Sequence, residues 1–151
     1  MKDAIAIIEY CRDIPQTIKL NNRVIRNLED IYYTPKAANQ LDGLPKSKNS
    51  VSKIVEDMAL NIPDGVSDTI RSLEEENKRL NNLYKEIIKE IHSLDYRENK
   101  VVYDFYIMNY RWEKIARGFY SVRQCKNIRT EALEKLQKKF EKNIYISNYF
   151  K

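Results

Sequence analysis

Glycine and proline are scarce in this chain, with only 3 Gly and 4 Pro among 151 residues. Their scarcity disfavours sheets joined by tight turns and active sites built on glycine-rich loops, and it favours long helices. The sequence contains no phosphate-binding loop, dinucleotide-binding glycine pattern, HExxH pair or nucleophile elbow, so nothing in it predicts an enzyme. We therefore expect an all-α protein that is not an enzyme and uses no cofactor.

Cysteine and histidine are equally rare. Cys11 and Cys125 lie far apart in the sequence and His92 is the only histidine, so no metal-ligand spacing exists and no metal site is expected. We expect both cysteines to be reduced, buried, small apolar side chains. Apolar runs stay well short of the roughly 20 residues that span a bilayer. These absences predict a soluble cytoplasmic protein with no membrane partner.

The charge that is present is unevenly distributed. The chain carries 27 Lys and Arg against 22 Asp and Glu, a net charge of +5. Residues 97–151 hold 13 basic and 6 acidic residues, a net charge of +7, so the preceding residues have a net charge of −2. Because neutralised phosphates supply most non-specific affinity for DNA, this asymmetry favours a C-terminal nucleic-acid module joined to a helical interaction module.

Apolar spacing predicts several helices in residues 1–93, which we interpret as an oligomerisation or interaction region. A first helix is expected from Lys2 to about Asp13, and Pro15 is expected to interrupt it or to start the next helix. A second amphipathic helix is predicted over 16–32. A loop over about 34–50 and a short helix from Val51 to Ala59 should follow.

The longest periodic pattern runs from Val66 to Leu94 in alternating steps of four and three residues. It predicts a coiled-coil-like helix over about 66–93 that pairs either with the helix at 16–32 of the same chain or with a second subunit. Asn77 interrupts the apolar pattern and either fixes the register of the pairing or faces a wet edge. The seam residues expected to contact an oligomer partner are Ile70, Leu73, Asn77, Leu80, Tyr84, Ile87 and Ile91.

Shorter helices are predicted after Leu94. One helix should bury a single apolar face and end at a turn over 109–111. The face is formed by Val101, Val102, Phe105, Tyr106 and Met108. A helix over 112–117 should then pack Ile115 and Ala116 inward, with Trp112 as a packing residue. Ser121 is predicted to cap a final helix from Val122 to about Lys142.

The final helix separates an apolar face from a polar face, as a DNA-recognition helix does. Arg bonds bidentately to guanine, and Gln or Asn bonds to adenine, in the major groove. The residues expected to read bases are Arg123, Gln124, Lys126, Asn127 and Thr130. The residues expected to position phosphates are Arg111, Lys114, Arg117, Ser121 and Arg129.

Residues 94–138 resemble promoter-binding region four of bacterial sigma factors, and the closest likeness is to phage late-gene regulators of the ArpU and RinA type. The resemblance is carried by Leu94, Arg97-Glu98, Val101-Val102, Phe105-Tyr106, 112–116, 121–123, Ile128 and 132–136. It implies a sigma-like helix-turn-helix over 94–142 that activates phage or prophage transcription. The turn Arg117-Gly118-Phe119-Tyr120 and the position of Cys125 depart from the family pattern, so the target sequence cannot be inherited.

Together these features predict a transcription regulator associated with the bacterial nucleoid. Its expected partners are double-stranded DNA, host RNA polymerase and a second copy of the chain as a homodimer or other homo-oligomer. One alternative is a helical adaptor or inhibitor that binds a protein partner through the coiled-coil seam. Another is a DNA-packaging or recombination accessory factor. The aromatic tail at 143–151 either packs on the domain or a subunit, or stacks on single-stranded nucleic acid.

Overall fold

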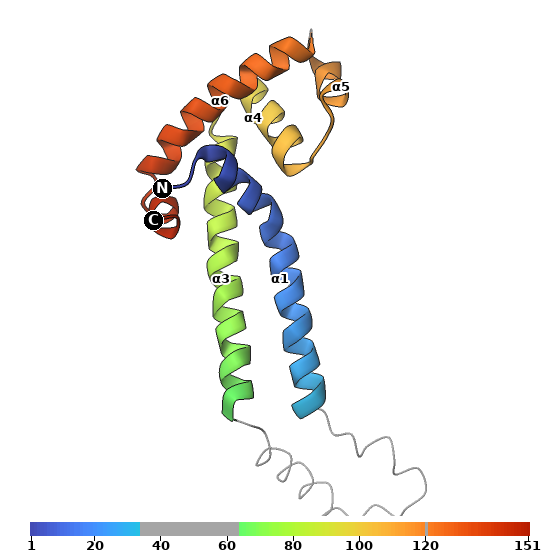
Figure 1. Cartoon of the computed structure of the whole chain (residues 1–151), viewed down its shortest axis with the longest axis vertical. Helices are drawn as coiled ribbons and strands as arrows, with labels where there is room; N and C mark the ends of the chain where they lie inside the picture. The colour runs from blue at the N-terminus through green and yellow to red at the C-terminus, as the bar shows by residue number, and fades with distance from the viewer. Residues whose placement is uncertain (34–63, 120) are drawn as a thin grey trace, which may run out of the picture. The chain divides into compact units, whose positions relative to one another are not determined.

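The computed structural model describes residues 1–33, 64–119 and 121–151, and these residues form helices without any strand (Figure 1). The all-α prediction is therefore confirmed. The loop and short helix predicted over 34–62 lie outside the described residues. In chain order the elements are α1 (Ala4–Tyr32), α3 (Asp64–His92), α4 (Tyr96–Val102), the π-helix η2 (Tyr103–Ile107), α5 (Trp112–Ile115), the 3-10 helix η3 (Ala116–Gly118), α6 (Val122–Lys142) and α7 (Ile144–Tyr149).

Helix α1 continues through Pro15, so the predicted division into two helices near this residue is wrong. Proline lacks an N–H and its ring crowds the carbonyl four residues earlier, which costs a helix interior about 3 kcal/mol. The flanking residues Cys11 and Ile14 are 0% and 1% exposed. The free energy gained by burying the helix face of Cys11 and Ile14 outweighs the local preference of proline for a helix boundary.

The described helices belong to two compact units. One unit comprises residues 1–17 and 79–151, and the other comprises residues 18–78. Helices α1 and α3 each contribute to both units, because the division falls within them.

In the unit of residues 18–78, α1 and α3 lie side by side and antiparallel. The Asn77 side chain donates to Asn22 Oδ1 and accepts from Asn21 Nδ2, with both N···O distances 2.9 Å. Near the C-terminal end of α1, Asp30 lines a shallow depression together with Arg71 of α3. This part of the seam thus packs on the helix of the same chain, and Asn77 is partly buried between Asn21 and Asn22. The role of Asn77 in setting the register stays a prediction.

The seam continues into the other unit as a fully buried face of α3. Leu80, Ile87 and Ile91 are at most 2% exposed, and Leu83, which lies outside the predicted four-and-three series, is 0% exposed. Tyr84 is partly buried, and burial raises the pKa of its hydroxyl. The seam residues nearer the start of α3, Ile70 and Leu73, are only partly buried.

The aromatic tail is a helix that packs on the N-terminal part of α1. The Tyr10 and Tyr149 hydroxyl oxygens are 2.9 Å apart, and the Phe150 ring meets the Tyr10 ring edge-on at 5.5 Å. Ile146 is 0% exposed. Packing on the domain is therefore the alternative that the structure supports for residues 143–151, and the two ends of the chain meet there (Figure 1).

Candidate nucleic-acid interface

A partly buried ion pair joins α6 to the start of α4. Glu98 is 6% exposed, and its carboxylate accepts a hydrogen bond from the Lys135 ammonium and from the backbone N–H of Asp95 at 3.4 Å. The second of these bonds belongs to a capping box that starts α4. The hydrogen bond to Glu98 raises the pKa of Lys135. Glu98 thus takes part in the cap of α4 and also holds α6 beside it through Lys135.

A small apolar core sets the orientation of α5 and α6. Val101 of α4, Ile115 of α5 and Cys125 of α6 are 0%, 2% and 0% exposed and pack together. Burial raises the pKa of the Cys125 thiol, as it does for Cys11, whose pKa rises to about 12. Both cysteines are free and buried, as the sequence predicted.

The segment before α5 departs from the predicted single helix. It widens into the π-helix η2 and ends in a turn at Asn109, whose φ of 55° is in the left-handed region that asparagine tolerates. Met108 was expected on the apolar face but is 44% exposed, because the wider turn carries it past the end of that face. The turn predicted over 109–111 is confirmed.

The start of α6 agrees with the sequence prediction. Ser121 is the N-cap, and its Oγ accepts from the Gln124 backbone N–H at 3.1 Å. This bond satisfies one of the four N–H groups that a helix start leaves without a partner. One lone pair of the Ser121 oxygen is therefore engaged by the helix, and the hydroxyl proton remains able to donate elsewhere.

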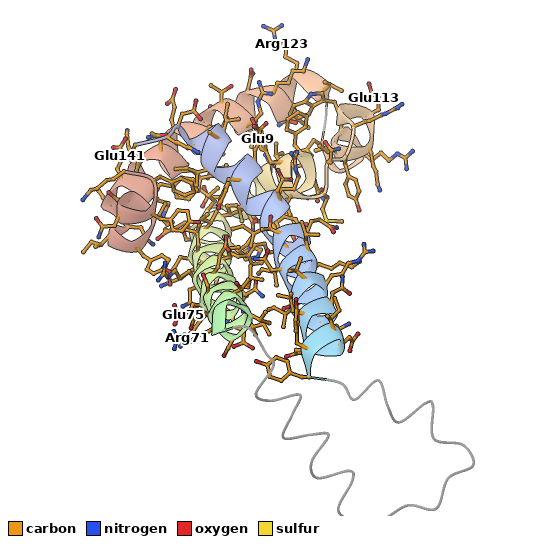
Figure 2. The ribbon with its side chains drawn as sticks, turned by 60° about the horizontal axis from the view of Figure 1, so that its bottom comes forward. Glu9, Arg71, Glu75, Glu113, Arg123 and Glu141 are labelled. Atoms are coloured by element: carbon orange, nitrogen blue, oxygen red, sulfur yellow. The ribbon has the colours of Figure 1, made fainter. Side chains whose placement is uncertain are left out.

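Four of the five predicted base-reading residues lie on the exposed face of the first half of α6. They are Arg123, Lys126, Asn127 and Thr130. Figure 2 shows the Arg123 side chain pointing outward from the first turn. The Thr130 hydroxyl donates to the Lys126 carbonyl at 3.1 Å, so its methyl group and oxygen lone pairs are what it presents. Exposed Glu131 and Glu134 follow and end this polar face.

The fifth residue, Gln124, lies apart from the others. It is partly buried and lines a shallow depression of about 330 Å³ together with Arg97, Arg117, Gly118 and Phe119. Two arginines converge there, so the depression suits an anion such as a phosphate. Arg97 was not among the predicted phosphate-positioning residues, because nothing in the spacing indicates that α4 and η3 meet.

The predicted phosphate-positioning residues also fall into two groups. Arg111, Lys114 and Arg117 are exposed at the ends and on the surface of α5 and η3, and the Lys114 ammonium lies 3.4 Å above the Tyr110 ring. Arg129 is different, because its guanidinium packs over the rings of Trp112 at 5.3 Å and Phe105 at 5.7 Å. Arg129 therefore has a packing role in addition to any contact with DNA.

This aromatic and cationic stack connects η2, α5 and α6. The Phe105 and Trp112 rings are stacked with centroids 4.2 Å apart, which agrees with the expected packing role of Trp112. Burial raises the pKa of the neighbouring Tyr106, and the charge and hydrogen bond of Arg129 partly offset that increase. The stack therefore holds the exposed polar face of α6 in a fixed relation to α5.

No family model, curated protein or solved structure matches this chain. The likeness to sigma region four and to the ArpU and RinA type therefore remains a prediction from the residues themselves. Within residues 1–33, 64–119 and 121–151, no helix is both long and apolar enough to cross a membrane. The same ranges hold no group of three His, Cys, Asp or Glu side chains able to bind a metal ion.

Proposed function

We propose that α5 and α6 form a helix-turn-helix and that the first half of α6 reads bases in the major groove of double-stranded DNA. The observation that carries this proposal is the separation of faces on α6. Cys125, Ala132 and Leu136 are each 0% exposed, while Arg123, Lys126 and Asn127 are exposed beside them. A helix fixed by its buried face and presenting Arg and Asn from its first turns is suited to direct readout.

The surrounding cations support the same proposal. Arg111, Lys114 and Arg117 flank the turn before α6, and Arg97 adds a fourth cation beside the depression. Contacts from such residues to phosphates position a protein on the duplex without reading its sequence. In this account the chain regulates transcription, and the resemblance to phage late-gene regulators makes activation of phage or prophage genes, with contact to host RNA polymerase, the proposed outcome.

Selection from genomic DNA fragments tests the proposal. The purified chain is mixed with a fragment library at moderate salt, retained fragments are sequenced, and the experiment is repeated with Arg123→Ala and Lys126→Ala. We expect an enriched motif for the wild type and a loss of affinity of roughly 5- to 150-fold for Arg123→Ala, since a bidentate contact to a base contributes about 1–3 kcal/mol.

Matched control variants come from the second half of the same helix. Lys138→Ala and Lys142→Ala remove the same charge from exposed positions of α6, and the motif should survive both. A wild type that enriches no motif, or a motif that depends equally on Lys138 and Arg123, would contradict the proposal.

A further inference from the structure

The second half of α1 carries an apolar face that α3 does not cover. Leu20, Val24 and Ile31 are 59%, 38% and 51% exposed. At 3.6 residues per turn their directions fall within an arc of about 40°. Asn21 and Ile25, which face α3, point roughly 80° and 120° away from the centre of this arc. The helix therefore has two separate faces suited to packing, and only one has a partner among the described residues.

The exposed face has the pattern of a coiled-coil seam. Leu20, Val24, Asn27 and Ile31 follow steps of four, three and four residues, as alternating seam positions do. Single exposed aliphatic residues are ordinary on protein surfaces, but a contiguous row in helical register marks an interaction surface. The row fits the seam of another helix.

The charges beside this row select the partner and its direction. Of the charged residues in this segment, Arg23 and Asp30 flank the row, whereas Lys19, Arg26 and Glu29 point about 120° or more away from its centre. Arg23 and Asp30 occupy equivalent positions one heptad apart, on the same edge of the row, and neither forms an ion pair with another described residue. A second copy of α1 running antiparallel would bring opposite charges together at both ends, whereas a parallel copy would not.

We propose that a second copy of this chain packs its α1 antiparallel across this face. Leu20 then meets Ile31 of the partner subunit, and Val24 meets the partner's Asn27. Arg23 pairs with Asp30 of the partner subunit, and two-fold symmetry makes each of these contacts twice. Dimer formation therefore uses α1, not the α3 seam, and it does not depend on the proposed DNA binding.

Sedimentation equilibrium of the full chain, without DNA, tests the proposed dimer. We expect the wild type to be a dimer at micromolar concentration. Leu20→Glu or Ile31→Glu should weaken the dimer at least about tenfold, because each puts a charge into an apolar contact that the two-fold symmetry makes twice. Ser72→Glu, an exposed position on α3, should change the dissociation constant less than about threefold. Circular dichroism should show the same helix content in all variants.

A charge exchange tests the direction of packing. Arg23→Asp should weaken the dimer several-fold, and adding Asp30→Arg should restore it, because each pair is then re-formed with reversed signs. A monomeric wild type would overturn the proposal. So would a dimer that tolerates Leu20→Glu, or a double variant no tighter than Arg23→Asp alone.

Discussion

At the scale of single residues, Glu98 links the sequence pattern to the position of α6. It is the one charged side chain classed as buried in the described ranges, and it serves both the capping box of α4 and the ion pair with Lys135. A buried carboxylate is retained only where hydrogen bonds compensate for its lost hydration. The Lys135 partner on α6 is 37 residues away in the sequence, so this contact becomes evident only in three dimensions.

Replacing Glu98 should lower stability by a measurable amount. We expect Glu98→Ala to reduce the free energy of unfolding by about 1–3 kcal/mol, because it removes a capping bond and a charge-assisted hydrogen bond. Glu98→Gln, which keeps the acceptor oxygen, should lose less. Urea unfolding followed by circular dichroism measures both, with exposed Glu134→Ala as a control expected to change the free energy by no more than about 0.5 kcal/mol. Equal losses for Gln and Ala would contradict this role of the charge and the acceptor.

At the scale of elements, the sequence predicted most helices because their apolar periods are long. The helix over 66–93 and the cap at Ser121 are found as predicted, since heptad spacing and an N-cap residue are local signals. The continuation of α1 through Pro15 and the exposure of Met108 were missed, because burial and a π-helical turn override local preference there. The polar face of α6 was predictable, but the packing of Arg129 on two rings was not.

Replacing Pro15 tests directly whether burial keeps α1 helical against the local preference of proline. Pro15→Ala restores an N–H able to donate to the Cys11 carbonyl and removes the clash of the ring, and Pro15 itself is exposed. We expect the free energy of unfolding to rise by about 1–3 kcal/mol, less than the full helix penalty because alanine also frees the unfolded chain. Thermal and urea unfolding check the sign. A loss of stability would mean that the backbone at Pro15 requires the proline geometry.

At the scale of the whole molecule, alkaline pH should destabilise the fold. Burial raises the pKa of the Cys11 thiol from 9.0 to about 12. Below pH 9 the thiol is protonated in both states, so its contribution is fully present. Between pH 9 and about 12 only the unfolded state ionises, and stability falls by up to about 1.4 kcal/mol per pH unit.

Urea unfolding at pH 8, 9, 10 and 11 under reducing conditions measures this loss. Cys11→Ala should have a shallower pH dependence than the wild type, although it starts from a lower stability because a buried side chain is shortened. The remaining slope is assigned to the other groups with raised pKa, which are Cys125, Tyr84, Tyr106, Lys100 and Lys135. Identical slopes for the two proteins would show that the Cys11 thiol is not the group responsible.

If the first half of α6 reads the sequence of double-stranded DNA, replacing Asn127 should change the preference at a single base pair. Asn127 is exposed on the polar face, and an asparagine there is expected to select adenine at one base pair. Base preferences are measured side by side for the wild type and Asn127→Ala by selection from random duplex DNA. We predict that the variant loses preference at one position and keeps the rest of the motif. An unchanged motif, or no motif for the wild type, would contradict the account.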